Sequence, residues 1–466
     1  MWIGRPGTDP SVESGQRIGD GALLAELYGA AVRAAAPGPA VAEALRSVSI
    51  SPADRVWVVS LGKAAQAMAT AAVERIANAG MEPAGGIVVA PLAEPAPHPR
   101  LLSIAGDHPL PGSHSVAAAS LLGDLAARVT RDDEVWVLLS GGATSLVGAP
   151  VNDVGIDELR ELYTILLGSG LDIVAMNTVR KRFSRWGGGR LAVALRAGRI
   201  RNLILSDVIG DDVSAIGSGP CIPDPTTAGE VRSMLTRGQL WSRLPVALQR
   251  HLAAVEQDTS LETPKPGDGR FDVVERRVVA GNRTALEAAV LRATEMGLNA
   301  RLASASVAGE AADVGARLVA LLMHYDEQRS PLEGQRAGRT CLVWGGETTV
   351  MLGDAHGRGG RCQELALAAA KAMFDRRADP GVALLAAGTD GRDGDTDAAG
   401  AVVDASSWSR MARLGLDPDR ALQTHDSYSV LDAAGALLRT GPTGTNVMDV
   451  MIGLGAREAA EAEEAA

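Results

Sequence analysis

Short apolar runs alternate along this chain with longer stretches rich in Ala and Leu, whose apolar positions follow a helical period. Val314, Leu318, Leu321 and Leu322 are an example of the longer kind. Short buried strands that alternate with helices form βαβ units, so the pattern predicts an α/β fold with a mostly parallel sheet covered by helices on both faces. No repeat of fixed period and no heptads interrupt this alternation.

Six of the predicted strands end in the same way, on glycine beside a small polar or charged residue. The sequences that follow them are LGK, GGATS, SDVIGDD, GNR, GGE and GTDG, after strands at 56–60, 135–140, 203–205, 278–280, 341–344 and 382–387. Ligands of open α/β sheets bind at the carboxyl ends of the strands. Gly and Asp are common in any βα turn, but six such turns in one chain favour a shared site.

A segment at 325–340 is charged, contains Pro and Gly, and has no apolar face, so it predicts a domain boundary. We expect a larger domain over 21–330 and a smaller α/β domain over 338–456. The Gly/Pro/Ser-rich residues 1–20 and the acidic residues 457–466 are expected to be flexible tails.

Composition narrows the class of protein. The chain has 466 residues, 46% of them hydrophobic and 22% charged, which is ordinary for a globular protein and excludes wholesale disorder. A net charge of −11 argues against nucleic acid and against an anionic membrane surface as partners. No apolar run approaches ~20 residues, and no signal peptide is recognisable, so we expect a cytoplasmic protein. Three widely spaced cysteines argue against a disulfide framework or a structural zinc site.

Two of the strand-end turns carry groups that suit an anion. Lys63 is one of only four lysines and opens an Ala-rich helix directly after a strand. Gly141 and Gly142 allow close backbone approach with free N–H groups, and Ser140 and Ser145 could add hydroxyl donors. The alternatives are an ordinary solvated lysine and a tight turn whose hydroxyls cap a helix.

Familiar nucleotide and hydrolase motifs are absent. The chain has no Walker A loop, and no GxGxxG follows a strand and opens a helix, which disfavours a P-loop NTPase and a standard Rossmann dehydrogenase. There is no HExxH and no GxSxG elbow. His108, in GDHPLPG, is better explained as a packed turn residue than as part of a cleft.

A cationic segment at 177–201 holds eight Arg and Lys and no acid. Such a run is usually a solvated helix face, and we expect this for most of its members. One or two of them are expected to face an anionic ligand.

Acidic strand-end loops suggest a hard cation. Asp207 lies in the long loop 206–227, and Asp390 lies in 388–400, where carboxylates suit Mg²⁺ that bridges phosphates. The alternative for these aspartates is turn formation and helix capping. Arg361 follows a glycine loop at a helix start, where a guanidinium can hold phosphate or carboxylate in a bidentate manner.

Taken in order, the motifs resemble the glycerate 2-kinase family, whose members end in a small module called the MOFRL domain. The matching stretches are LGKAAQAM, GDHPLPG, LLSGGATSL, MNTVRKRFS, LSDVIGDDVSAIGSGPCIPDPTT, GNRTALEAA, GGETTV, GRGGRCQELALA, GTDGRDGDTDAAGAVVD and TGPTGTNVMDVMIGL. They extend from about residue 22 to 456. The resemblance implies phosphorylation of D-glycerate to 2-phosphoglycerate with ATP and a divalent metal, in a cleft between a larger Rossmann-like domain and a smaller α/β domain.

The resemblance also implies site residues. The essential lysine of the family corresponds to Lys63 and its essential arginine to Arg361, on opposite sides of the predicted boundary, so domain closure would assemble the site. Asp207 is expected either to bind Mg²⁺ or to activate the 2-hydroxyl, and Asp390 is assigned the same two roles. The positions expected to bind substrate or phosphate are Ser140, Gly141, Gly142, Ser145, Asn282, Glu347, Gly359, Gly360 and Asp390.

Four positions depart from the family pattern, and two other functions stay open. The departures are Ala143, Gly187, Cys362 and Met448; Gly187 and Cys362 bear on substrate preference more than on reaction type. The rival activities are reduction of hydroxypyruvate by NAD(P)H and non-catalytic binding of a sugar acid. The oligomeric state is open, with a homodimer as one option.

Overall fold

The computed structural model describes residues 19–51, 53–151, 153–171, 173–327, 338–353 and 356–456. Of the two predicted tails, 457–466 lies outside these residues, and so does 1–20 apart from its last two positions. Asp20 is already the first residue of helix α1 (Asp20–Ala34).

The first sheet has six strands, all parallel, in the order β3-β2-β1-β4-β5-β6. Its strands are β1 (Arg55–Leu61), β2 (Gly85–Ala90), β3 (Leu101–Ala105), β4 (Asp133–Leu139), β5 (Arg199–Leu205) and β6 (Val274–Ala280). This confirms the predicted parallel sheet, and the strand order is that of a doubly wound Rossmann fold.

Helices cover both faces of the first sheet, as its apolar strands require. Along β1, Val56 and Val58 pack on one side and Trp57 and Val59 on the other. The first side is covered by α2 (Pro37–Leu45) and α3 (Ala65–Ala77), and the second by α4 (Ser113–Ala126), α5 (Ala143–Leu146) and α8 (Arg190–Leu195).

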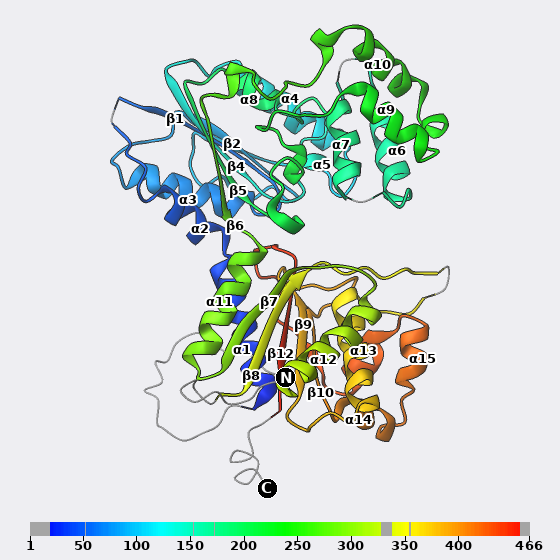
Figure 1. The fold of residues 1–466 in the computed structure, drawn as a ribbon. Helices are drawn as coiled ribbons and strands as arrows, with labels where there is room; N and C mark the ends of the chain where they lie inside the picture. Colours follow the sequence, from blue (N-terminus) through cyan, green and yellow to red (C-terminus); the bar gives the residue numbers. More distant parts are fainter. Residues whose placement is uncertain are drawn as a thin grey trace.

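Four further helices pack against one another beside this sheet and form a core of their own (Figure 1). They are α6 (Ile156–Leu167), α7 (Ile173–Phe183), α9 (Ala228–Arg237) and α10 (Val246–Gln257). Single-turn 3₁₀ helices occupy 209–211, 216–218, 241–243, 259–261 and 269–271.

The second sheet is mixed and has the order β11-β10-β9-β12-β8-β7. Its strands are β7 (Asn299–Val307), β8 (Thr340–Gly346), β9 (Ala383–Gly388), β10 (Gly400–Asp404), β11 (Leu437–Leu438) and β12 (Asp449–Leu454). Only the pairing of β7 with β8 is parallel. The helices of this lobe are α1, α11 (Asn282–Glu295), α12 (Ala311–Glu327), α13 (Arg361–Asp375), α14 (Ser407–Arg413), α15 (Pro418–Gln423) and α16 (Ser427–Ala433).

The division between the two lobes differs from the predicted boundary. Strand β7 lies before the 325–340 segment and pairs with β8, which lies after it, so both strands belong to the second sheet. Helix α11 packs against β7 and β8, and α1 packs against α11 (Figure 1). The chain therefore passes between lobes at residues 35–36 and at Gly281, because α1, α11 and α12 cover the second sheet. The segment 325–340 connects α12 to β8 within one lobe, and its residues 328–337 lie outside the described part of the chain.

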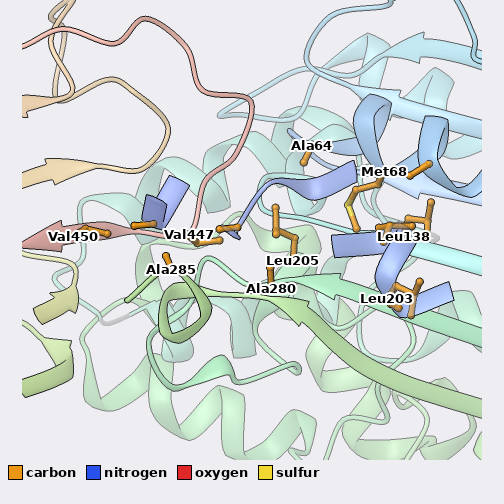
Figure 2. Packing of buried hydrophobic residues seen from close by; sticks show 14 of the residues in the cluster. Ala64, Met68, Leu138, Leu203, Leu205, Ala280, Ala285, Val447 and Val450 are labelled. Atoms are coloured by element: carbon orange, nitrogen blue, oxygen red, sulfur yellow. The ribbon is translucent and has the colours of Figure 1, made fainter. Parts of the chain in front are cut away.

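The two lobes share part of their hydrophobic core. One continuous cluster joins the α3 side of the first sheet to the α1 and α11 side of the second. Figure 2 shows residues of the first sheet and its helix (Ala64, Met68, Leu138, Leu203, Leu205 and Ala280) in one group with Ala285, Val447 and Val450 of the second lobe. This shared packing fixes which loops of the two lobes meet.

None of the helices in the described residues is long and apolar enough to cross a membrane.

Candidate functional site

The first half of the site lies where the strand order of the parallel sheet reverses, between β1 and β4. Chains leave these neighbouring strands toward opposite faces, which opens a crevice at their carboxyl ends. Gly62 has φ +125°, and a Cβ there would lie 2.2 Å from Ser140 Oγ. The N–H of Lys63 donates to the carbonyl of Gly141 at 2.9 Å. The loops after β1 and β4 are therefore held in direct contact.

Three functional side chains converge on the glycine loop. A Cβ on Gly141 would lie 1.7 Å from Asp207 Oδ2, so the carboxylate rests directly on this backbone. A Cβ on Gly142 would lie 3.1 Å from His108 Cδ2 and 3.3 Å from Lys63 Cγ. The structure thus brings Lys63 and Asp207 together, as the sequence predicts, and adds His108 from the loop after β3.

The ionisation of these groups reflects their proximity. Burial raises the pKa of Asp207, and the positive charge of Lys63 opposes that shift. Burial lowers the pKa of His108, and Lys63 acts in the same direction. The Lys63 side chain is exposed, and within the described part of the chain it has no ion pair or hydrogen bond. Its ammonium is available to a ligand.

The hydroxyl groups of the two serines in the loop are not free to donate to a ligand, which differs from the prediction. Ser140 is buried, and its Oγ accepts the N–H of Ala64 at the start of α3, at 3.1 Å. Ser145 is also buried and donates to the carbonyl of Gly142 at 3.2 Å. Both hydroxyls hold the loop in shape, which was the alternative weighed from the sequence. For the N–H groups of Gly141 and Gly142, the described residues supply no acceptor.

The second half of the site is built around Arg361, the first residue of α13. Its Nε donates to Asp449 Oδ2 at 2.7 Å and its Nη2 donates to Asp449 Oδ1 at 2.9 Å. Its Nη1 lies 3.0 Å from Oε1 of Glu347, which follows β8. Asp449 is fully buried at the start of β12, in register with Gly346 of β8. Neighbouring strands therefore supply both carboxylates.

Glu347 connects the two halves. Burial raises its pKa, the ion pair with Arg361 opposes this, and further contributions come from Asp207 and Lys63 in the other lobe. Charges that change the pKa of one carboxyl from both sides must lie close to it. Lys63 and Asp207 of one lobe and Arg361 of the other therefore all act on the ionisation of Glu347; that residues 63 and 361 share one cleft stays a prediction.

The start of α13 does not offer its N–H groups to a ligand, contrary to the expected phosphate cradle. The N–H groups of Cys362 and Gln363 donate to the buried carboxylate of Asp393 at 3.1 and 2.8 Å. A Cβ on Gly360 would lie 2.3 Å from Asp393 Cγ, and one on Gly359 would lie 2.2 Å from Ser427 Oγ. These glycines allow close packing of the chain, and Asp393 takes the position expected for an anion.

Asn282 also differs from its predicted binding role. It is buried at the start of α11, and its Nδ2 donates to the carbonyls of Val447 and Asp449 at 2.8 and 3.0 Å. It holds the backbone beside Asp449, so its contact with the site runs through that residue.

The two predicted Mg²⁺ ligands lie in different lobes. Asp390 follows β9 and lines a cavity of about 340 Å³ with Arg361 and Asp393. No contact in the described residues joins Asp390 to Asp207, and these residues contain no group of three or more His, Cys, Asp or Glu that could hold a metal ion. The pKa of Glu347 responds to the charge of Asp207, so these two carboxylates are within electrostatic reach of each other. Carboxylate oxygens are suitable ligands for a hard cation that takes its other ligands from water and phosphate.

The cationic segment is more buried than a solvated helix face. Arg182 is buried and forms ion pairs with Asp224 (3.2 Å) and Glu262. Lys181 is buried with Asp224 4.0 Å away. The expectation of a solvated face is therefore wrong for these two residues. Their charged groups can be buried because acidic side chains surround them and pair with them.

Two of the departures from the family pattern lie beside Asp449. Cys362 is fully buried; burial and then the charge of Asp449 raise its pKa well above the usual value. Met448 has φ +69°, a left-handed conformation that Asn adopts more readily than Met.

The sequence analysis missed Asp449 and discounted His108. Asp449 stands directly before a run of apolar residues in DVMIGL, and an acid at the start of a fully buried strand is a signal that could have singled it out. No sequence pattern around His108 identifies it as a site residue. The loop after β3 comes close to Lys63 only because of the order of the strands in the sheet.

Fold and geometry together define a class: a two-lobed α/β protein with an unpaired lysine and a glycine loop at the switch point of its parallel sheet and a fixed arginine in the other lobe. A model described as a domain of unknown function (DUF4147) matches residues 23–253, and the MOFRL family model matches 340–449. The chain is 33% identical to a glycerate 2-kinase of Pyrococcus horikoshii, over 92% of this chain and 96% of that one. The crystal structure of a glycerate kinase from Thermotoga maritima aligns with a TM-score of 0.80 at 35% identity, covering 93% and 99% of the two chains.

A protein of Agrobacterium vitis named "Putative hydroxypyruvate reductase" is 36% identical over 92% of this chain and 93% of its own. All of these relatives match along nearly their whole length. The chain belongs to the glycerate 2-kinase family, and the predicted family, fold and kinase class are confirmed.

Proposed function

We propose that this protein transfers the terminal phosphoryl group of ATP to the 2-hydroxyl of glycerate. The observation that carries the proposal is that Glu347 pairs with Arg361 of its own lobe, while its pKa also responds to Lys63 and Asp207 of the other lobe. Phosphoryl transfer requires mainly positioning and neutralisation of charge on the equatorial oxygens. A cleft with one mobile and one fixed cation suits that requirement.

The two cations have different tasks in this proposal. Lys63 is exposed and unpaired, so its ammonium can follow the moving phosphoryl group while the N–H groups of Gly141 and Gly142 bind its oxygens. Arg361 is fixed by Asp449 and directs its Nη1 edge toward Glu347. The carboxylate of glycerate would bind that edge in place of Glu347.

Asp207 has two open roles. Its raised pKa suits acceptance of the proton from the 2-hydroxyl. With Glu347 it would also hold Mg²⁺, which neutralises phosphate charge when bound with the nucleotide. A magnesium titration of Asp207→Asn separates the roles: a ligand role raises the Mg²⁺ concentration needed for half activity, whereas a base role lowers kcat at every Mg²⁺ concentration.

The proposed activity is tested with purified protein, glycerate, ATP and Mg²⁺. Mass spectrometry of the product should show phosphoglycerate, and consumption of that product by enolase should identify the 2-phosphate. Formation of 3-phosphoglycerate alone would overturn the proposed regiochemistry, and absence of ADP release would overturn the kinase proposal.

The reductase alternative is supported by the name of the Agrobacterium vitis relative. Oxidation of NADH or NADPH with hydroxypyruvate, followed by absorbance in the same preparation, measures it directly. We expect no oxidation above the rate without enzyme, because the loop after β1 lacks the GxGxxG turn that binds a dinucleotide. Cytoplasmic location and a homodimer stay predictions.

A further inference from the structure

A second cavity lies at the amino-terminal ends of the strands of the parallel sheet, opposite the end that carries the glycine loop. It has a volume of about 1760 Å³ and is lined by residues that precede the sheet strands: Arg131 before β4, Arg196 before β5 and Val273 before β6. Lys63 and Gly141 follow the carboxyl ends of β1 and β4, so the strands of the sheet separate this cavity from the proposed catalytic cleft. We call it the arginine cavity.

The arginine cavity concentrates positive charge in a chain whose net charge is −11. Its basic lining residues are Arg131, Arg185, Arg190, Arg196, Lys265 and Arg270. Lys265 is paired with Glu262 and Arg270 with Asp268. In the part of the chain that the structure describes, the other four have no ion pair with a carboxylate.

Arg190 is the most enclosed of these four. Its Nη1 donates to the carbonyls of Lys181 (2.7 Å) and Ser184 (3.1 Å), so backbone groups hold it in place without neutralising it. Burial lowers the pKa of Arg190 to about 10, and the neighbouring charge of Arg182 acts in the same direction. A guanidinium held in such a place would gain from a bound anion.

The surrounding charges leave an excess of cations. Asp224 and Glu262 are the carboxylates whose charge acts on Arg190, and both already pair with Arg182. Lys181 also relies on Asp224, and Lys265 on Glu262. Each of these two carboxylates therefore already pairs with two cations, and Arg190 is a further positive charge beside them.

A neighbouring cavity of about 810 Å³ extends the positive surface. Arg185 and Arg190 line both cavities, and the second one adds Arg250 and His251, with Asp153 as its acidic member. Arg185 also stacks on Trp186 with 4.8 Å between its Cζ and the ring centroid, which limits the guanidinium to a few orientations.

We propose that the arginine cavity binds a phosphorylated small molecule that carries at least two negative charges. Planar guanidinium groups bind phosphate oxygens in pairs, and several arginines from different elements suit several phosphate or carboxylate groups on one ligand. The volume exceeds the ~300–1,000 Å³ of typical small-molecule sites, so a lone phosphate ion would not fill it. This site goes beyond the proposed kinase activity and does not depend on it.

Inorganic tripolyphosphate is a suitable probe, titrated by calorimetry into the full-length protein without Mg²⁺. The test variant is Arg131→Gln/Arg196→Gln, since both side chains are exposed and unpaired and their loss leaves the core intact. The matched control is Arg237→Gln/Arg420→Gln, which removes two exposed arginines elsewhere. Lys63→Ala removes binding at the proposed cleft.

We expect the cavity variant to weaken tripolyphosphate binding at least about tenfold, from the loss of two charge-assisted contacts. The control should change it less than about twofold, and Lys63→Ala should retain one equivalent of bound probe. Unchanged binding in the cavity variant, equal weakening in the control, or loss of all binding in Lys63→Ala would overturn the proposal. None of these results depends on whether the protein phosphorylates glycerate.

Discussion

Arg361 and Asp449 form a two-point ion pair, with hydrogen bonds of 2.7 and 2.9 Å, between the first residue of α13 and the first residue of β12. Asp449 is fully buried, and its backbone carbonyl accepts from Asn282. The aspartate is therefore held by its neighbours and in turn sets the direction of the guanidinium. This makes Asp449 a positioning residue for the cleft.

Replacement of Asp449 by Asn should lower both activity and stability. The amide keeps the shape but removes the charge, so we expect a loss of about 1.5–3 kcal/mol in unfolding free energy. We also expect a rise in the KM for glycerate that exceeds the fall in kcat. Thermal unfolding and steady-state kinetics measure these effects, with Asp419→Asn as control because its ion pair with Lys371 is exposed. A native KM in Asp449→Asn would contradict the positioning role.

Lys63→Ala should be nearly inactive yet as stable as the native protein. Loss of charge stabilisation at a phosphoryl group costs ~3 kcal/mol or more, which corresponds to at least about a hundredfold in kcat. The midpoint of thermal unfolding should not change, because the ammonium is exposed and unpaired within the described residues. Lys371→Ala is the matched control and should keep native kinetics. A Lys63→Ala enzyme with near-native kcat would remove this lysine from the mechanism.

Gly141→Ala should disable the cleft without unfolding the protein. The added methyl group would lie 1.7 Å from Asp207 Oδ2, so the carboxylate must move away from Lys63. We expect a fall in kcat of at least about tenfold, since misplacement by about 1 Å has large effects on rate. Gly21→Ala is the control, because a Cβ there meets no atom within 4 Å. Equal kinetics for the two variants would show that Asp207 does not act from this position.

Asp393 should make stability depend on pH. Burial raises its pKa to about 7, even though two N–H groups of α13 donate to it. The ordinary value is 3.8, so between these pH values the folded protein binds more protons at this site than the unfolded chain does. The stabilisation is full below pH 3.8 and is lost as the pH rises through about 7, by ~4 kcal/mol in total.

Urea unfolding of the native protein and of Asp393→Asn at several pH values tests this. The difference in unfolding free energy between the two proteins should shift against the native protein as the pH rises from about 4 to 8. A difference that does not vary with pH would mean that Asp393 titrates outside this range.

Arg182→Met should destabilise the helical part beside the first sheet. The guanidinium is buried and pairs with Asp224 and Glu262, and its removal leaves the buried Asp224 and the partly buried Glu262 with fewer partners. Removing one member of a buried ion pair costs about 3–5 kcal/mol. Arg160→Met, on the exposed side of α6, should cost less than about 0.5 kcal/mol in the same denaturant experiment. Equal stability of the two variants would mean that the buried network contributes nothing.

Local signals were sufficient for the fold class and for the elements that carry the site. All six strands predicted from short apolar runs are present, because a buried strand requires such a run whatever its neighbours are. The turns with Lys63, Gly141 and Asp207 were also found in sequence, because six strands of one chain end on the same kind of turn. Arg361 was identified together with them.

Tertiary structure decided what those residues touch. The domain boundary was misplaced because strand pairing of β7 with β8 crosses a segment that looks like a linker. Ser140, Ser145 and Asn282 have the right chemistry for ligand binding, but packing directs them to backbone groups. Asp449 could be assigned to the site only from the pairing of β12 with β8.

The amino-acid sequence by itself determined that strands of both sheets end on turns of Gly with a small polar or charged residue, because backbone conformation and charge are local properties. Which turns face each other was decided by the strand order and by the core shared between the lobes. Glu347 pairs with Arg361, and its pKa responds to charges of the other lobe. Both relationships depend on packing between segments that are distant in the sequence, so no local pattern encodes them.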